Sequence, residues 1–148
     1  MNHANLPIAV HIFFIKGKQI LLLQRVGTGF QDGKWSVPAG RLNTGESITS
    51  AAIREAQEEI GVKINTKELS QPLIMHHHDE RGERIYAFFI CKAWQGEPRN
   101  MEPTVCSDLK WFTLGELPIN SMVTHVNYAV ERLLENVRYV EYGFEVKT

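Results

Sequence analysis

The chain contains little cysteine, and its two cysteines, Cys91 and Cys106, are widely separated. Two cysteines at this spacing form neither a disulfide framework nor a zinc-binding pattern. Free cysteine is among the most buried residue types, so we expect both to be small side chains in or near the core.

Long apolar runs and an excess of one charge are also missing. The apolar stretch 8–15 is interrupted by His11, and no segment approaches the roughly 20 apolar residues of a membrane span. Lys and Arg (16) balance Asp and Glu (17), so the formal net charge is −1. This balance argues against a general polyanion binder, and we expect neither a nucleic-acid nor a membrane partner. Because residues 1–7 lack the basic start of a secretory signal, we expect a cytoplasmic protein.

The composition and the pattern of elements predict one soluble globular domain over residues 1–148. Hydrophobic residues make up 43% and charged residues 22%, and the chain has no repeat, low-complexity tract or linker. We expect strands at 8–15, 19–26, 73–78, 84–94 and 109–113, an extended piece at 35–38, and helices at 47–60 and 121–136. Loops are expected at 27–34, 39–45 and 95–105, and the tail from Tyr139 has no clear pattern. Several strands and two separated helices favour helices packed on a mixed sheet, an α/β (α+β) fold.

The helix expected over 47–60 carries carboxylates on its apolar side. At about 100° per residue, its apolar stripe is formed by Ile48, Ala51 and Ala52. Glu55 and Glu59 fall near the middle of that stripe, and Glu58 lies at its edge. Ser47 is expected to cap the start of the helix, and Gly61 fits the left-handed residue that often ends one.

Carboxylates in an apolar stripe need a partner. Bare carboxylates facing the core are costly, and several close together repel one another and raise their pKa values. A hard divalent cation removes both problems, and Mg²⁺ takes one or two carboxylates while keeping waters and phosphate oxygens. Arg54 is placed to orient or neutralise one glutamate. A solvated acidic helix face is the common explanation of Glu-rich helices, but the apolar placement argues against it here.

The wider pattern around the helix is Gly40-x5-Glu46-x7-Arg54-Glu55-Ala56-x-Glu58-Glu59-x-Gly61-Val62. It spans 23 residues and resembles the signature of the Nudix hydrolases, especially the MutT-type members, at nine positions if Ala56 is allowed. The family usually has a larger aliphatic residue at Ala56, which affects packing more than chemistry. The resemblance implies an α/β/α sandwich, with a mixed β-sheet flanked by two main helices.

The resemblance also implies roles for the residues of the signature. Nudix enzymes split a nucleoside diphosphate linked to another group, using Mg²⁺ or sometimes Mn²⁺. Glu55, Glu58 and Glu59 would bind the metal and carry the catalysis, and Arg54 would hold Glu55 in place. Glu46 would be an indirect or weaker metal contact.

The loop before the helix would complete this site. By resemblance, the main-chain carbonyl of Ala39 would be a further metal ligand, and Gly40 and Gly45 would let the backbone fold tightly around metal and phosphates. A metal lowers the pKa of bound water and so creates a nucleophile at neutral pH. A glutamate or another carboxylate nearby would take the proton.

Three residues outside the signature are candidates for catalysis or substrate binding, again by resemblance. Arg25 matches an arginine that faces substrate phosphates, although it could be a surface arginine. Glu102 lies four residues after the proline of the run 94–98, where MutT-type enzymes have a glutamate that binds metal or acts as base; it could equally be an ordinary loop carboxylate. Asn120 resembles an asparagine that reads a purine edge, but the local spacing differs by one residue.

The remaining candidates are aromatic. Trp35 and Phe30 could stack on a base or belong to the core. On a strand, His76 and His78 would share one face and His77 would oppose it, so two histidines could contact a nucleotide or a metal. A polar strand end before a turn explains the histidines as well, and we do not expect a zinc site.

The leading hypothesis is a Mg²⁺-dependent hydrolase that converts a nucleoside triphosphate, and among these an oxidised purine nucleotide, to monophosphate and pyrophosphate. Only about seven residues precede the first expected strand, whereas many ADP-ribose-type members carry an additional N-terminal region. The alternatives are an ADP-ribose or nucleotide-sugar pyrophosphatase and a non-catalytic nucleotide-sensing module. Either a monomer or a homodimer is compatible with the sequence.

Overall fold

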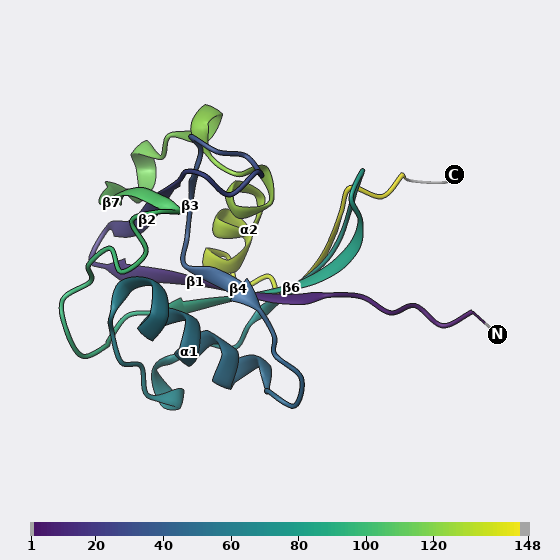
Figure 1. Cartoon of the computed structure of the whole chain (residues 1–148), viewed down its shortest axis with the longest axis horizontal. Helices are drawn as coiled ribbons and strands as arrows, with labels where there is room; N and C mark the ends of the chain where they lie inside the picture. Colours follow the sequence, from purple (N-terminus) through teal and green to yellow (C-terminus); the bar gives the residue numbers. More distant parts are fainter. Residues whose placement is uncertain (1, 146–148) are drawn as a thin grey trace.

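A computed structural model describes residues 2–145 as a mixed β-sheet with one helix on each face (Figure 1). The strands are β1 (Ile8–Lys16), β2 (Gln19–Arg25), β3 (Trp35–Ser36), β4 (Ala39–Arg41), β5 (Leu73–Asp79), β6 (Gly82–Cys91), β7 (Cys106–Thr113) and β8 (Tyr139–Tyr142). The helices are α1 (Ile48–Ile60) and α2 (Thr124–Leu134), with 3-10 turns at Thr66–Glu68, Leu114–Glu116 and Ile119–Ser121.

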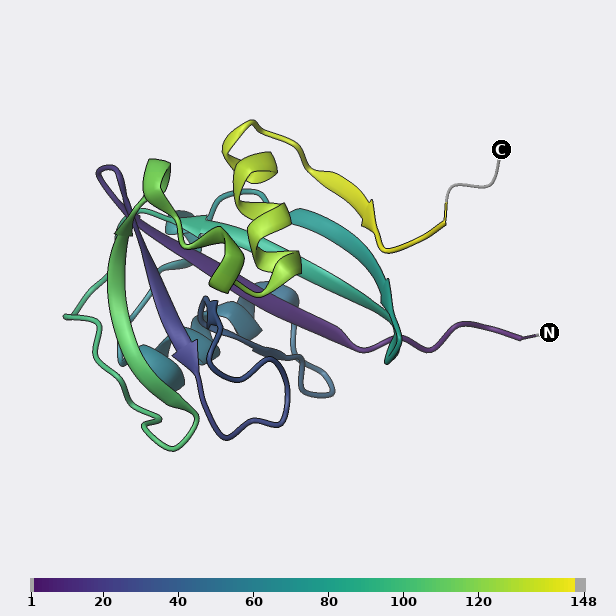
Figure 2. The ribbon, with the colours of Figure 1, turned by 90° about the horizontal axis from the view of Figure 1, so that it is seen from above.

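The sheet has the strand order β3-β2-β1-β6-β5-β8, with β4 paired to β1 and β7 paired to β2. The pairs β1–β6 and β5–β8 are parallel, and the other pairs are antiparallel. Figure 2 shows α2 and α1 on opposite sides of this sheet. The α/β/α sandwich and the mixed sheet predicted from the sequence are therefore confirmed. None of the helices within residues 2–145 is long and apolar enough to span a bilayer.

The central strand β1 supplies side chains to two hydrophobic cores. Successive residues of a strand point to opposite faces. Phe13 and Ile15 join the core under α2, whereas Ile12 and Phe14 join the core under α1. This two-sided burial explains why the stretch 8–15 is apolar almost without interruption. The cysteines are both free and buried, as expected.

Residues 39–41, expected to be loop, form β4. Ala39 and Arg41 pair with His11 and Ala9 of β1, and Gly40 pairs with Val10. A three-residue strand is too short to show alternating polarity, so its pairing is visible only in the folded chain. This pairing fixes Ala39 and Gly40 beside the sheet.

The second helix begins later than predicted. The range 121–136 includes Met122 and Val123, but the Val123 N–H donates to the Trp35 carbonyl at 2.9 Å and Met122 bridges to Trp35. These contacts keep the chain extended, so α2 begins at Thr124. The last turn also ends early, at Leu134.

The strands β6 and β7 differ most from their predicted bounds, and β8 is not predicted. β7 begins at Cys106 rather than 109, since its first residues pair with β2, and β6 ends at Cys91 rather than 94. The tail contains β8, which adds to β5 in parallel at the edge of the sheet. Parallel pairing between distant segments leaves little signal in a four-residue sequence.

A stack of buried histidines fills part of the α2 side. His11 of β1 and His77 of β5 each lie 5.4 Å, between ring centroids, from His125 of α2. Tyr86 of β6 packs at 4.6 Å from His125. Burial lowers the pKa of His11 to about 3 and that of His125 to about 2, so both rings are neutral at physiological pH.

These neutral histidines predict a loss of stability in acid. Between pH 6.5 and about 3, a histidine of the unfolded chain binds a proton that folded His11 or His125 does not. Each such group lowers the free energy of unfolding by about 1.4 kcal/mol per pH unit as the pH falls. Urea denaturation from pH 6 to pH 4.5 should therefore show a shallower pH dependence for His125→Leu than for the wild type. Exposed His3→Gln serves as the control, and equal slopes for wild type and His125→Leu would contradict the prediction.

Candidate active site

Helix α1 is bounded by the two residues that the sequence predicts. The Ser47 side chain accepts a hydrogen bond from the Ser50 N–H at 3.0 Å, which caps the first turn. Gly61 ends the helix in the left-handed conformation with a φ of 71°. The buried residues between these caps are Ala51, Ala52, Glu55, Ala56 and Ile60. The apolar stripe therefore contains a glutamate, as the projection predicts, and Ala56 lies in the core with no exposed surface.

Arg54 is bound to three carboxylates. Its Nε and Nη2 donate to both oxygens of Glu46 at 2.7 and 2.9 Å, and its Nη1 donates to Glu55 at 2.8 Å and to Glu58 at 3.1 Å. Nη2 also donates to the Arg41 carbonyl at 3.0 Å. Arg54 and the Asn43 N–H lower the pKa of Glu46 to about 2. Of the two roles predicted for Glu46, the geometry matches the indirect one, in which it holds Arg54.

The Glu55 carboxyl group lies directly against the backbone of Gly40. A Cβ built on Gly40 would overlap the carboxyl atoms of Glu55. Only glycine leaves room for this approach. Glu55 is 8% exposed, and Arg54 fixes one of its oxygens from the other side. The position of the Glu55 carboxyl group therefore depends on the lack of a side chain at Gly40 and on the hydrogen bond from Arg54.

Glu59, which is half-buried, binds the loop before the helix. Its Oε2 accepts a hydrogen bond from the Ala39 N–H at 3.0 Å. Burial first, and then the charge of Glu55, raises the pKa of Glu59 well above its usual value. Burial likewise raises the pKa of Glu55. Two carboxyl groups this close need a shared proton or a cation between them.

A cavity of about 200 Å³ opens beside Glu59. Glu102 lines this cavity together with Glu59, and its charge contributes to the raised pKa of Glu59. The Glu102 N–H donates to the Asn100 side chain, and the Glu102 carbonyl accepts from the N–H groups of Val105 and Cys106. This compact turn places Glu102 at the site, as predicted from its spacing to the run 94–98.

The carboxylates fit a hard divalent cation. Glu55 and Glu59 offer oxygen donors next to each other, and a cation bound there would offset the mutual repulsion that helps to raise the pKa of Glu59. Within residues 2–145, no three acidic, histidine or cysteine side chains are already grouped as a metal shell. Glu58 is instead turned to Arg54, and its side chain is 51% exposed. A cation with two protein carboxylates, waters and substrate oxygens matches this arrangement.

Of the predicted substrate-binding residues, Arg25 reaches the site and two others do not. Arg25 lines the same cavity as Glu59. Trp35 packs edge-on against Phe112 at 4.8 Å, and Asn120 is exposed in the 3-10 turn Ile119–Ser121. Neither lines this cavity, so base stacking by Trp35 and purine reading by Asn120 find no support in the geometry.

Sequence reasoning missed a second cavity of about 240 Å³. It shares Arg25 and Ala39 with the first cavity and contains Phe30 and Gly40. The residues not singled out from the sequence as site residues include Arg84, His11, Tyr86 and His125. The sequence offers a signal for His11 alone, because it is the polar residue within the apolar run 8–15.

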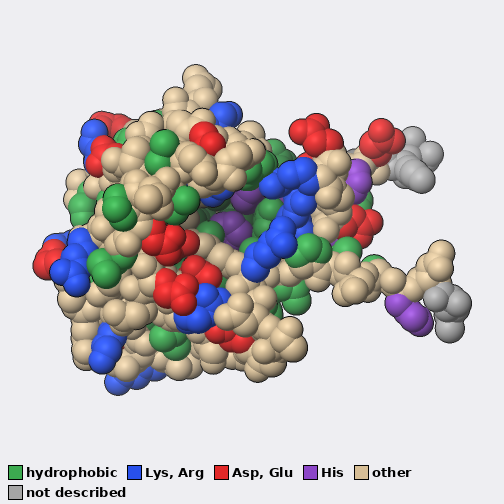
Figure 3. All heavy atoms as spheres, in the orientation of Figure 1, with side chains coloured by type: hydrophobic (Ala, Val, Ile, Leu, Met, Phe, Trp, Pro, Cys, Tyr) green, Lys and Arg blue, Asp and Glu red, His purple; other side chains and the backbone are tan. Residues whose placement is uncertain are grey.

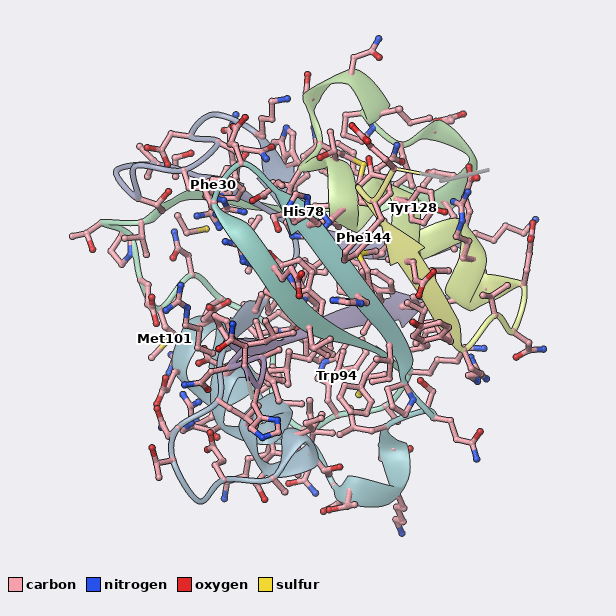
Figure 4. The ribbon with its side chains drawn as sticks, turned by 90° about the vertical axis from the view of Figure 1, so that its right-hand side faces the viewer. Phe30, His78, Trp94, Met101, Tyr128 and Phe144 are labelled. Carbon is pink, nitrogen blue, oxygen red and sulfur yellow. The ribbon has the colours of Figure 1, made fainter. Side chains whose placement is uncertain are left out.

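The histidine run follows the predicted alternation. His77 is 5% exposed and belongs to the stack on the α2 side. His76 and His78 share the opposite face, where both rings pack against Phe144 at 4.5 and 5.4 Å; Figure 4 shows His78 and Phe144 side by side. The structure thus supports the view that these histidines are part of the packing, and none of them lines the cavity beside Glu59.

Gly40→Ala should disrupt the metal site without unfolding the chain. The new methyl group would displace the flexible end of Glu55. We expect Mn²⁺ affinity, measured by isothermal titration calorimetry, to fall about 10–100-fold. Gly115→Ala is the matched control, because a Cβ there meets nothing within 4 Å. Wild-type Mn²⁺ affinity in a folded Gly40→Ala protein would rule out the close approach as a requirement.

Comparison with known proteins identifies the family of the chain and several relatives. The model of the NUDIX domain family matches residues 5–133. Among solved structures, the MutT NUDIX hydrolase of Burkholderia pseudomallei has the same fold, with a TM-score of 0.76 and 24% identity; the match covers 88% of this chain and 99% of that one.

Curated relatives carry two kinds of activity in their names. The 8-oxo-dGTP diphosphatase of Proteus vulgaris is 29% identical over 66% of this chain and 85% of its own length. The ADP-ribose pyrophosphatase of Methanocaldococcus jannaschii is 30% identical over 75% of this chain and 64% of its own length. A nudix hydrolase of Caenorhabditis elegans is 27% identical, and the chain spans 33% of its length. The family match covers most of the chain and includes the whole 40–62 signature, and we conclude that the chain belongs to the NUDIX domain family.

Proposed function

We propose that the chain is a divalent-metal-dependent Nudix pyrophosphohydrolase of nucleotides, and that its substrate is a nucleoside triphosphate, cleaved to monophosphate and pyrophosphate. Family membership and relatives named as nucleotide hydrolases support the enzyme class. We infer that the metal is Mg²⁺, with Mn²⁺ as a substitute, and that the enzyme works in the cytoplasm as a monomer or homodimer.

The observation that carries the proposal is the buried pair Glu55 and Glu59. The two carboxyl groups meet against the backbone of Ala39 and Gly40, where burial raises both pKa values. In a protein without chemistry at this point, an apolar pair would be more favourable. A cation bound here neutralises the carboxylates and the substrate phosphates together.

The residues of the chain have separate tasks in the proposed reaction. Glu55 and Glu59, with the Ala39 carbonyl, would hold the cation, and Glu58, whose carboxyl group Arg54 holds, would contact it through a bound water. The cation would polarise the phosphate oxygens and lower the pKa of the attacking water. Arg54, itself held by Glu46, keeps Glu55 and Glu58 in position.

Glu102, on the wall of the cavity, takes a proton from the attacking water, and the oxygen of that water forms the new bond to phosphorus. The phosphorus–oxygen bond on the far side breaks, and the leaving phosphate carries away the electron pair. Arg25, which lines the same cavity, binds the phosphate oxygens.

A nucleoside diphosphate sugar or ADP-ribose is the second candidate substrate. The ADP-ribose pyrophosphatase relative aligns with a larger share of this chain than the 8-oxo-dGTP diphosphatase relative, at similar identity. A non-catalytic nucleotide sensor is the third alternative, and the retained set of glutamates argues against it. Since Asn120 does not line the cavity beside Glu59, the oxidised-purine preference rests on the named relatives alone.

A nucleotide panel with Mg²⁺ tests the proposal directly. We expect pyrophosphate release from nucleoside triphosphates, abolished by EDTA, and a fall in kcat of about 10²-fold or more for Glu59→Gln, because a general acid–base or metal-binding carboxylate is lost. Exposed Glu131→Gln on α2 is the matched control and should retain wild-type kcat.

The same panel separates the alternatives. Faster cleavage of ADP-ribose than of every triphosphate would replace the first substrate with the second. Absence of turnover on the whole panel, together with unchanged Mn²⁺ affinity in Glu59→Gln, would reject the enzyme.

A further inference from the structure

The second cavity has a lining of one charge sign. Four of its lining residues are arginines, namely Arg25, Arg41, Arg81 and Arg84, and none is an aspartate or glutamate. We call this cavity the arginine pocket. Figure 3 shows on this face a group of acidic side chains, a run of basic side chains beside it, and histidine in the hollow between them.

The positive charge of the arginine pocket is only partly balanced. Arg81 and Arg84 share a single carboxylate, that of Asp79, at 2.9 and 3.0 Å. Arg25 donates to two uncharged oxygens, the Phe30 carbonyl and the Thr28 hydroxyl. Within residues 2–145, neither Arg25 nor Arg41 makes an ion pair shorter than 4.0 Å.

Burial makes this imbalance costly. Arg84 is 8% exposed, and the pocket is also lined by His11 and His125, both neutral because burial lowers their pKa values. The neutral rings add no compensating charge. The buried Nδ1 of His11 has no hydrogen-bond partner within the described chain. The buried guanidinium of Arg84 shares the single negative charge of Asp79 with Arg81. A bound anion would supply the missing negative charge, so its binding is favourable.

The hairpin and the neighbouring loop enclose the pocket. Arg81, at the turn between β5 and β6, places its guanidinium 3.5 Å from the centroid of the Phe30 ring. Phe30 belongs to the loop 27–34, and Figure 4 shows it at the tip of the hairpin. An anion bound by Arg81 and Arg84 would therefore lie under this contact, partly removed from water, where its hydrogen bonds are stronger.

The two cavities carry charges of opposite sign, which indicates which part of a substrate each one binds. Both cavities include Arg25 and Ala39, so a diphosphate bound to a cation at the glutamates can extend into either. Glu59 and Glu102 repel an anionic extension from the first cavity. We propose that the arginine pocket binds a phosphate group that the substrate carries in addition to the phosphoanhydride that is cleaved. This inference rests on the proposed function and specifies its substrate class.

Matched substrate pairs that differ by one phosphate test the inference. The pairs are a nucleoside triphosphate with its diphosphate, and NADPH with NADH. We expect kcat/KM to be higher for the phosphate-bearing member of one pair, and this preference to fall about tenfold in Arg84→Gln and in Arg81→Gln, since each loses a charge-assisted hydrogen bond. A preference within the triphosphate and diphosphate pair would place the phosphate at the end of a polyphosphate chain. A preference within the NADPH and NADH pair would place it on a distant sugar. Arg138→Gln, outside the pocket, is the control and should keep the wild-type ratio.

A binding measurement separates this inference from the proposed function. Tripolyphosphate is titrated calorimetrically in EDTA, so neither metal nor turnover contributes. We expect about tenfold weaker binding to Arg81→Gln, which changes only an exposed turn residue, than to wild type or Arg138→Gln. If no nucleotide is cleaved but this difference is found, the proposed function fails and the anion pocket stands. Equal tripolyphosphate affinity in all variants, or unchanged preference ratios in an active enzyme, overturns the inference.

Discussion

The site depends on two carboxyl groups that are buried side by side on one helix. Glu55 and Glu59 meet where α1 crosses β4, and each is fixed by a different partner. Gly40 admits the first because it has no side chain, and the Ala39 N–H binds the second. Arg54 supplies the only strong positive charge that α1 itself brings to the pair. Sharing a proton satisfies the pair electrostatically, and a divalent cation does so more completely.

The sheet makes this arrangement rigid. β1 fills both cores and pairs along its edge with β4, so the residues that contact the glutamates are held by the most buried strand of the fold. α1 packs on the same strand through its alanines. The loop 100–106, which brings Glu102, is the less regular part, but its side-chain and backbone hydrogen bonds close it into a turn. The group proposed for catalysis thus lies on a loop, and the groups proposed to bind metal lie on a rigid scaffold.

The sequence was most informative where local pattern and chemistry coincide. The helical period placed Glu55 in an apolar stripe, and both caps of α1 follow from single residues. Trp35 and Asn120 lie away from the cavity beside Glu59, because their positions depend on the packing of β3 against β7 and on the bridge from β3 to the turn before α2, which local sequence does not encode. Arg84 was overlooked because an arginine beside a turn usually points to solvent, and only the neighbouring strands reveal that it is buried.

The groups proposed for catalysis and the arginine pocket occupy different parts of the chain. The glutamates lie on α1 and the loop 100–106, whereas Arg81 and Arg84 belong to the β5–β6 hairpin. The two cavities share Arg25 and Ala39, and Gly40 of the arginine pocket lies against Glu55. The tip of the hairpin can therefore change its length or charge during evolution while α1 keeps its environment. Related chains with the same signature can diverge in substrate at this hairpin alone, and an engineered exchange of residues 79–84 is a compact route to a new preference.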